Sequence, residues 1–307
     1  MGVFAEGHIE TREGFVATIG FFDGVHRGHQ YLISQLHDLA KSTSLGSMVI
    51  TFAKHPRLVV QPQAQVSLLT SNEQKSALLQ EQGIDKTVFL DFTPEMSMMT
   101  AYQFMLYLYE EWQVRVLLIG YDHRFGHNRS EGFEDYVRYG QEMGMKVVQA
   151  KEERISEEQG VSSSEVRQFI QEGEMDKASQ CLGRYYDFTG KVVSGYHKGL
   201  KLGFPTANLE LDIPNRLLPP VGVYVVWASL GEHTYKAMLN IGYRPTVSFD
   251  GKISLEVHLL HFNREIYGET MHVSVVHRLR NEVKFSSPEQ LVEQLQRDAH
   301  AVEMCLK

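Results

Sequence analysis

The segment Thr18-Ile-Gly-Phe-Phe-Asp-Gly-Val-His-Arg-Gly-His29 decides the fold of the first half of the chain. It follows the apolar run Phe15–Ile19, which is typical of a buried strand, and it precedes Gln30–Ala40, whose apolar spacing predicts an amphipathic helix. Its three glycines allow tight turns and a close approach of the backbone to a ligand. Two histidines stand where the helix begins, and the free N–H groups and positive dipole end found there favour phosphate. The segment therefore predicts chemistry on a nucleoside triphosphate.

The histidines His26 and His29 carry this prediction. A single histidine near a helix start is commonly only a hydrogen-bonded surface residue, but here the pattern is Gly-Phe-Phe-Asp-Gly-x-His-x-Gly-His. This pattern resembles the HxGH signature of the nucleotidyltransferase superfamily, in the form seen in bacterial FAD synthetases, which are bifunctional riboflavin kinase/FMN adenylyltransferases. The resemblance implies that both histidines are catalytic and stabilise charge on the phosphoryl group transferred from ATP. It also implies ligand-binding positions at Gly20, Phe22, Asp23 and Gly24.

Length and composition limit the possible classes of protein. The chain has 307 residues, enough for two domains, and its 43% hydrophobic content supports sizeable cores. A formal net charge of -8 does not indicate bulk attraction to nucleic acid or to an anionic membrane. The two cysteines, Cys181 and Cys305, lie far apart without metal-ligand spacing, which favours a reducing cytosol. The start of the chain lacks a signal-peptide pattern and no apolar run is long enough to span a bilayer, so we expect a cytoplasmic protein.

The first half of the chain alternates short apolar runs with helical patterns. Strands are predicted at Phe15–Ile19, Met48–Phe52, Thr87–Leu90, Val114–Ile119 and Lys146–Gln149. Helices are predicted near residues 29–41, 72–82, 95–112 and 131–143. Strands this apolar, separated by helices, predict an α/β Rossmann-like domain with a parallel sheet covered on both faces. In such sheets ligands bind beyond the carboxyl ends of the strands.

The pattern changes after a charged, helical connector at residues 151–183. Successive strands without intervening helices then predict an antiparallel β-barrel or sandwich. These strands are expected at Lys191–Ser194, Gly222–Leu230, Thr234–Ile241, Ile253–Phe262 and Met271–Arg278. A C-terminal helix capped by Ser287 follows. We therefore expect a first domain over residues 1–183, connector included, and a second over residues 184–307.

Two other segments of the first domain, Thr51–Pro56 and Gly120–Gly132, resemble further motifs of the same family. In the first segment, His55 is expected near the active cleft, although a histidine before a proline most often belongs to a turn. In the second, Asp122 and Arg124 follow a strand, and an arginine fork suits phosphate while an aspartate can accept from ribose or flavin groups. A structural ion pair in the loop is the alternative. Two positions depart from the family pattern: Phe21 replaces Asn, and His123 replaces Phe.

The segment Val161-Ser-Ser-Ser-Glu-Val-Arg167 is similar to the family's phosphate loop. Serine hydroxyls precede a predicted helix, and Arg167 lies near its N-terminus, where a cation is unfavourable unless an anion binds. A simple serine N-cap is the alternative. The resemblance implies nucleotide contacts from Ser162, Ser163, Ser164 and Arg167.

The second domain begins with a glycine-rich block that ends in Gly203-Phe-Pro-Thr-Ala-Asn208. In an extended segment residues two apart point the same way, so Thr206 and Asn208 can converge on one ligand through the oxygen atoms that Mg²⁺ prefers. An isolated Thr-x-Asn is usually a turn or strand edge, but this six-residue match resembles the Pro-Thr-Ala-Asn motif of riboflavin kinases. The resemblance implies ATP and Mg²⁺ binding by Thr206 and Asn208. It also implies nucleotide or flavin contacts from Gly199, Gly203 and Pro205.

The strand Ile253–Phe262 places Glu256 and His258 on one face and apolar residues on the other. An exposed glutamate on a strand is ordinarily only solvated. Glu256 is similar, however, to the catalytic carboxylate of riboflavin kinases, which implies that it accepts the proton of the ribityl hydroxyl that attacks ATP. His258 is expected to pack or hydrogen-bond nearby. His261 stands where the family has Asp.

Two motif sets in the family's order predict a bifunctional enzyme that phosphorylates riboflavin to FMN and adenylylates FMN to FAD, with ATP as co-substrate of both steps. One alternative is a nucleotidyltransferase for another phosphate acceptor with a non-catalytic barrel, against which Asn208 and Glu256 argue. Another is an inactive flavin-binding regulatory module, against which the intact His26 and His29 argue. No nucleic-acid or membrane partner is expected, and the sequence leaves the oligomeric state open.

Overall fold

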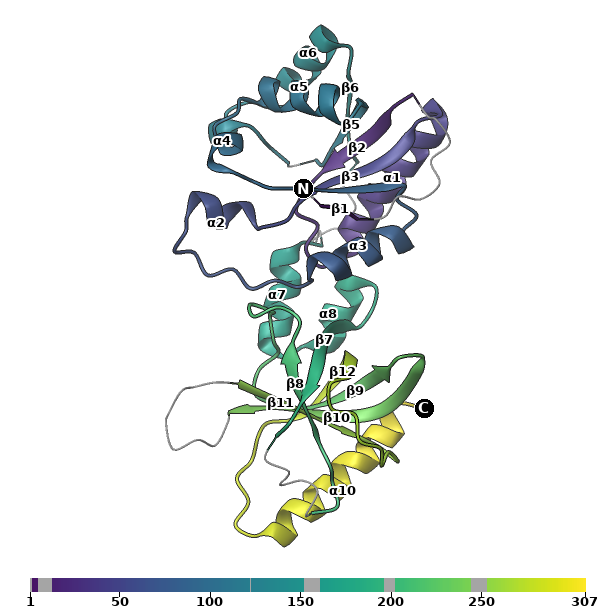
Figure 1. The fold of residues 1–307 in the computed structure, drawn as a ribbon, viewed down its shortest axis with the longest axis vertical. Coiled ribbons are helices and arrows are strands. Elements are labelled where there is room, and N and C mark those ends of the chain that lie inside the picture. The colour runs from purple at the N-terminus through teal and green to yellow at the C-terminus, as the bar shows by residue number, and fades with distance from the viewer. Residues whose placement is uncertain (1, 5–12, 122, 152–160, 196–201, 244–252) are drawn as a thin grey trace. The chain divides into compact units, whose positions relative to one another are not determined.

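The computed structural model describes residues 2–4, 13–121, 123–151, 161–195, 202–243 and 253–307. Asp122 and Gly199, both expected at binding sites, lie outside the described residues. Contacts between residues divide the chain into two units, Met1–Ser162 and Ser163–Lys307 (Figure 1). Each unit has its own hydrophobic core.

The first unit is built on a six-stranded sheet in the order β1-β4-β3-β2-β5-β6. Its strands are β1 (Gly2–Phe4), β2 (Phe15–Ile19), β3 (Gly46–Phe52), β4 (Lys86–Leu90), β5 (Val114–Ile119) and β6 (Lys146–Gln149). Neighbours from β2 to β6 are parallel, which confirms the predicted parallel sheet, and β1 adds an antiparallel edge to β4. Strands β3 and β4 are added in turn on one side of β2, and β5 and β6 are then added on its other side. The carboxyl ends of β2 and β5 therefore flank the reversal of strand order, where such sheets bind ligands.

Helices cover both faces of this sheet (Figure 1). The helices of this unit are α1 (Arg27–Thr43), α2 (Pro56–Val60), α3 (Asn72–Glu81), α4 (Pro94–Ser97), α5 (Ala101–Glu111) and α6 (Phe133–Met143). On one face Leu108 of α5 and Tyr136 of α6 pack against the strands, and on the other face Leu36 of α1 and Leu79 of α3 do so. All five residues of β2 are buried as a result, which is why this strand is apolar except for Thr18 and shows no alternation of apolar and polar residues.

The second unit contains a closed six-stranded barrel in the order β10-β11-β8-β7-β12-β9, in which every described pair is antiparallel. Its strands are β7 (Tyr186–Val193), β8 (Ala207–Leu211), β9 (Gly222–Leu230), β10 (His233–Tyr243), β11 (Ile253–Leu259) and β12 (Thr270–Arg280). The barrel confirms the predicted antiparallel fold. In β11 the residues Leu255, Val257 and Leu259 are buried, while Glu256 and His258 between them remain partly exposed.

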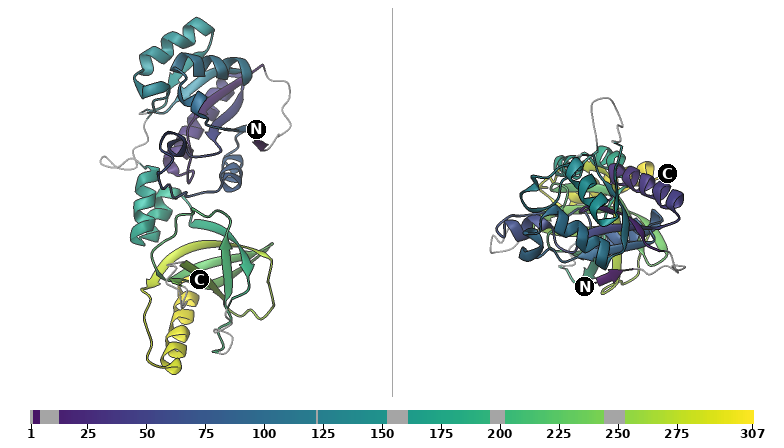
Figure 2. Two further views of the ribbon diagram at one scale, coloured as in Figure 1. Left: turned by 60° about the vertical axis from the view of Figure 1, so that its left-hand side comes forward. Right: turned by 90° about the horizontal axis from the view of Figure 1, so that it is seen from above.

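The C-terminal helix α10 (Pro288–Cys305) lies beside the barrel (Figure 2). Ser287 caps it as predicted, because its side chain accepts a backbone N–H of the first turn. Val302 packs into a core shared with the barrel. The guanidinium of Arg280 binds both carboxylate oxygens of the buried Asp298 at 2.6 to 3.1 Å, which fastens the helix to β12.

Two helices, α7 (Ser163–Glu172) and α8 (Met175–Leu182), form most of the predicted connector. They pack with the barrel unit, where His277 Nδ1 of β12 lies 2.9 Å from Asp176 Oδ2 of α8. The second unit therefore begins at Ser163, whereas residues 151–183 were expected in the first domain. A domain boundary between residues 183 and 184 stays a prediction.

Several local features differ from the predicted elements. The predictions lack the edge strand β1, the short helix α2 and the strand β8, and the helix predicted over residues 95–112 is two helices, α4 and α5. The break occurs because Thr100 caps α5 and forms a reciprocal capping box with Gln103. Among the described residues, no helix combines the length and apolar character needed to cross a bilayer.

Candidate active sites

Two loops of the first unit line one large cavity at the reversal of strand order, with a volume of about 1180 Å³. One loop follows β2 and the other follows β5. The polar and aromatic residues on its wall include Phe21, His29, His55, Arg57, His123, His127 and Arg129. No Asp or Glu stands among the described residues that line it, although the chain as a whole carries a net charge of -8. A cavity with cationic and imidazole groups and no carboxylate suits a polyphosphate anion.

The histidines His26 and His29 lie stacked at the start of α1, with ring centroids 3.7 Å apart. His26 is the N-cap of the helix, and its Nδ1 accepts the backbone N–H of His29 at 3.4 Å, which assigns the ring proton of His26 to Nε2. His29 Nδ1 is buried and has no hydrogen-bond partner among the described residues. Burial lowers the pKa of His29 well below 6.5, and the neighbouring His26 and Lys75 lower it further. The imidazole of His29 is therefore neutral at pH 7 and offers a single N–H to a ligand.

Gly28 permits the close packing of the histidine loop. A Cβ at this position would lie 2.9 Å from the carbonyl oxygen of Val161 and 3.3 Å from the ring of His26. At position 24 glycine is favoured for a different reason, because the φ of +80° lies in the left-handed region. Because Ser162 follows Val161, this packing brings the first serine of the predicted phosphate loop beside the histidine loop.

Asp23 shapes the same loop from inside the protein. It is only 2% exposed, and its carboxylate accepts the N–H groups of Leu69 and Thr70 and the hydroxyl of Thr70, all at 3.0 Å. Gly24 N donates to the same hydroxyl at 3.2 Å. Phe22 is buried in the core next to this network. These observed partners are protein groups, so the ligand contacts implied for Asp23, Phe22 and Gly24 stay predictions.

His55 both belongs to a turn and lies at the cavity, the two possibilities considered for it. Its Nδ1 accepts the N–H of Arg57 at 3.1 Å, so it caps α2, and it also lines the large cavity. Its ring lies 4.5 Å from the ring of Phe21. Phe21 thus presents an aromatic wall to the cavity at the position where the family often has an amide.

Tyr136 holds the second loop in place. Its hydroxyl accepts the N–H of Phe125 at 3.1 Å and lies within hydrogen-bond distance of the carbonyl oxygens of Phe125 and Glu131, and its ring stacks on Phe125 with centroids 4.3 Å apart. Arg124 is exposed and lines a smaller cavity of about 120 Å³ together with His123 and several aromatic side chains. The phosphate contact implied for Arg124 stays a prediction.

The serine loop spans the division between the units. Ser162 closes the first unit, whereas Ser163 opens α7 in the second, with Ser164 and Arg167 in the same helix. Arg167 is partly exposed. The nucleotide contacts implied for these four residues stay predictions.

In the second unit, Thr206, Asn208 and Glu256 come together on the outer side of the barrel. Asn208 of β8 is paired directly opposite Glu256 of β11, and Thr206 Oγ1 donates to Glu256 Oε2 at 3.4 Å. Asn240 of β10 is the register partner of Glu256 on its other side. Directly paired residues share a face of the sheet, so three strands present one polar row of Asn208, Glu256 and Asn240.

Two neighbours fix this polar row. His258 Nδ1 donates to the carbonyl oxygen of Pro205 at 2.7 Å, which holds the residue before Thr206. Burial lowers the pKa of His258, and the bond to Pro205 opposes that shift in part. A Cβ at Gly195 would overlap the side-chain amide of Asn208, so the chain can pass this amide only with glycine there. Gly195 and Asn240 were not predicted as site residues, because only the strand register and the close approach of the chain place them at the polar row.

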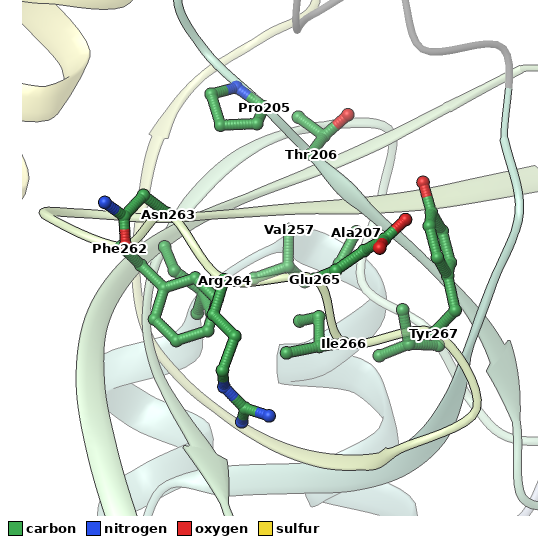
Figure 3. Close-up of a pocket in the computed structure, with 12 residues that line it drawn as sticks. Pro205, Thr206, Ala207, Val257, Phe262, Asn263, Arg264, Glu265, Ile266 and Tyr267 are labelled. Atoms are coloured by element: carbon green, nitrogen blue, oxygen red, sulfur yellow. The ribbon is translucent and has the colours of Figure 1, made fainter.

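A cavity of about 350 Å³ opens beside Thr206 (Figure 3). Pro205 and Thr206 lie at one edge, and the side chains of residues 262–267 surround much of the rest. Arg264 steadies that loop through a two-bond contact with Glu269 at 2.7 and 3.1 Å. A largely apolar slot beside the hydroxyl of Thr206 suits a planar ring system.

Comparison with protein families matches both halves of the chain. The family model described as FAD synthetase matches residues 8–165, and the one described as riboflavin kinase matches residues 182–306. The two matches follow one another in the order of the two structural units.

Curated relatives resemble the chain over nearly its whole length. Proteins named bifunctional riboflavin kinase/FMN adenylyltransferase include one from Listeria monocytogenes (34% identical, covering 92% of this chain and 90% of the relative) and one from Escherichia coli K12 (35%, covering 94% and 91%). A crystal structure described as a macrolide-efflux protein from Streptococcus pneumoniae matches with a TM-score of 0.88 at 31% identity over 96% of each chain. This last likeness supports the fold, and the printed activity belongs to that protein.

Proposed function

The chain belongs to the family of bifunctional riboflavin kinases/FMN adenylyltransferases, and we propose that it carries out the two ATP-dependent transfers at two separate sites. In this proposal the barrel unit phosphorylates riboflavin to FMN and the sheet unit adenylylates FMN to FAD. One observation carries it: each unit has its own set of polar side chains beside its own cavity.

In the sheet unit, a phosphate oxygen of FMN attacks the α-phosphorus of ATP. A new oxygen–phosphorus bond forms, and pyrophosphate leaves as the bond between the α-phosphorus and its bridging oxygen breaks. The nucleophile is already anionic, so the site has to align the substrates and stabilise charge rather than remove a proton. The neutral ring of His29, stacked on His26, supplies an N–H for the triphosphate, and the described residues that line the cavity add no carboxylate that would repel two phosphorylated substrates.

The flavin ring of FMN has a matching place in the same unit. The smaller cavity beside Arg124 is lined by Phe52, Phe92 and Phe104, and the first two rings meet edge to face at 5.4 Å. Aromatic walls suit the planar isoalloxazine ring. The two cavities share His123 and Arg129 of the loop after β5, so a flavin in the smaller one would direct its phosphate toward the larger.

In the barrel unit, the terminal hydroxyl of the ribityl chain attacks the γ-phosphorus of ATP. Glu256 accepts the hydroxyl proton as the new bond forms, and ADP leaves. Thr206 lies beside this carboxylate, and the apolar cavity next to Thr206 takes the adenine ring of ATP.

Thr206 and Asn208 would hold Mg²⁺ together with ATP oxygens and water. The side chains fit this ion because both offer neutral oxygen donors, and the hydroxyl of Thr206 directs its proton to Glu256 and keeps lone pairs for a cation. Bound there, Mg²⁺ neutralises negative charge on the ATP phosphates. Elsewhere in the described parts of the chain, no cluster of three His, Cys, Asp or Glu side chains forms a metal site.

Incubation of the purified protein with riboflavin, ATP and Mg²⁺, followed by separation of the flavins, tests the proposal. We expect FMN to appear first and FAD to follow. Accumulation of FMN without FAD, even with excess ATP, would contradict the adenylylation site. Conversion of supplied FMN without phosphorylation of riboflavin would contradict the kinase site. The cytoplasmic location stays a prediction.

A further inference from the structure

Lys75 of α3 is a buried cation directly behind the histidine loop. Its side chain is 1% exposed, and lysine is almost never fully buried without a partner. Among the described residues no carboxylate oxygen lies within ion-pair distance of its Nζ. Instead Nζ lies 3.4 Å from Thr51 Oγ1, 4.0 Å from the centroid of the Phe21 ring and 5.6 Å from that of Phe89.

These contacts connect Lys75 to the wall of the adenylylation cavity. Thr51 Oγ1 donates to the carbonyl oxygen of Phe21 at 3.0 Å, so Lys75 reaches both the backbone of Phe21, through Thr51, and its ring. The opposite neighbour of that ring is His55, at 4.5 Å. Phe21 itself lines the cavity and directly precedes Phe22, whose φ is +52°. A non-glycine residue in the left-handed region needs surroundings that hold it there.

The segment just before α3 is fastened to the same loop. Asp23 binds the N–H groups of Leu69 and Thr70 at 3.0 Å, and Ser71 caps the helix one turn before Lys75. The position of the ammonium group is therefore set by the histidine loop itself. This arrangement is costly, because burying a charge without a paired carboxylate opposes folding.

We propose that Lys75 is a positioning residue of the adenylylation site, whose buried ammonium group holds Phe21 and thereby the loop that carries His29 in its ligand-binding geometry. The proposal rests on the proposed function of the sheet unit. The attraction between the ammonium and the ring of Phe21 requires the charged form of Lys75. Loss of that charge should loosen the cavity wall while the barrel site is untouched.

Titration of Lys75 provides a test without any substitution. Burial lowers its pKa to about 8, an effect that Asp23 opposes, and His29 is the other titratable group that faces it. His29 is already neutral at this pH, and phosphate monoesters lose their second proton near pH 6, so neither the histidine nor the substrates titrate there. In the wild-type protein we expect kcat/KM for the conversion of FMN to FAD to fall as pH rises through about 8. Phosphorylation of riboflavin by the same protein should show no such fall.

Lys75→Met removes the charge and keeps an unbranched side chain. We expect adenylylation to fall at least about 10-fold at pH 7 and to lose the decline near pH 8, while riboflavin phosphorylation stays within about twofold. The melting temperature of Lys75→Met at pH 7 should be at or above that of the wild type, because the variant no longer buries a charge. This advantage should shrink between pH 8 and 10.5, where folded wild-type protein loses the proton that the unfolded chain keeps.

Lys86→Met is the matched control, since Lys86 also lies over aromatic rings in this unit, those of Phe15 and Trp112. It should keep the wild-type rate and the decline near pH 8. A wild-type profile that is flat through pH 8, or a Lys75→Met protein with the wild-type adenylylation rate, would overturn the inference. A Lys75→Met protein that melts lower but keeps the decline would assign Lys75 a packing role only. Failure of the proposed function is distinguishable, because the wild type would then make no FAD at any pH.

Discussion

His29 stands at the start of a helix and has a buried ring nitrogen that no described residue hydrogen-bonds. Burial, His26 and Lys75 all lower its pKa below 6.5, so the free protein holds this imidazole neutral. A bound triphosphate would reverse part of this effect, because nearby negative charge favours the protonated ring.

A titration of His29 by NMR measures this coupling. In the free protein the ring signals should titrate well below pH 6.5, and a non-reactive ATP analogue should move the midpoint upward. His37, which lies on the exposed side of the same helix and contacts Gln82, should not respond to the nucleotide. A His29 midpoint near 6.5 that the analogue leaves unchanged would contradict a phosphate contact.

The role proposed for Asn208 is tested by how riboflavin phosphorylation depends on MgATP. Asn208→Ala removes one oxygen ligand beside Glu256 but leaves the base in place. We expect KM for MgATP in riboflavin phosphorylation to rise about 10-fold or more, with the conversion of FMN to FAD unchanged. Asn281→Ala, at an exposed position beyond β12, is the control. Equal MgATP dependence in wild type and Asn208→Ala would exclude the metal-site assignment.

At the scale of elements, the start of α1 depends on its contact with the segment before α7. Gly28→Ala would place a Cβ 2.9 Å from the carbonyl oxygen of Val161 and force the histidine loop or that segment to move. Alanine also favours the helix over glycine by about 1 kcal/mol, which offsets part of the strain. We therefore expect adenylylation to fall at least about 10-fold while the free energy of unfolding changes by roughly 1 kcal/mol or less.

Gly132→Ala serves as the control for this change. Gly132 also stands at a helix start in the same unit, but nothing lies within 4 Å of a Cβ built there. Its activity should match that of the wild type. If Gly28→Ala retained full adenylylation, the close fit at Val161 would have no part in shaping the site.

Most elements of the fold could be predicted because their signals are local. The apolar run Phe15–Ile19 is β2 with the predicted bounds, and Ser287 caps α10 as predicted. The strand β8 was not predicted because it begins inside a glycine-rich block and is fixed by pairing with β7 on one side and with β11, far along the chain, on the other. Such pairing leaves no periodic pattern in the sequence.

The candidate sites follow the same rule. Motif spacing indicated His26, His29, Thr206, Asn208 and Glu256, which the structure brings together as two separate groups. Lys75 gave no signal, because a lysine in a helical pattern ordinarily faces solvent, and only the packing of α3 against β3 and the histidine loop buries it. Asp23 shows the converse case, since a motif residue proves to be bound by Leu69 and Thr70 inside the protein.

At the scale of the whole molecule, two reactions are divided between two units with separate cores. The sheet unit holds the histidine loop and the large cavity beside it, and the barrel unit holds the polar row around Glu256. The product of the barrel reaction, FMN, is the phosphate nucleophile of the sheet reaction. Each activity should therefore survive the loss of the other.

Glu256→Gln tests this central claim most directly. The substitution keeps the shape of the side chain and removes the base, so the purified variant should form no FMN from riboflavin and ATP yet convert supplied FMN to FAD at the wild-type rate. His29→Ala, assayed beside it, should show the reverse pattern, with adenylylation slowed by about 10²–10³ and phosphorylation retained. Loss of FMN adenylylation in a folded Glu256→Gln protein would contradict the assignment of the two reactions to two sites.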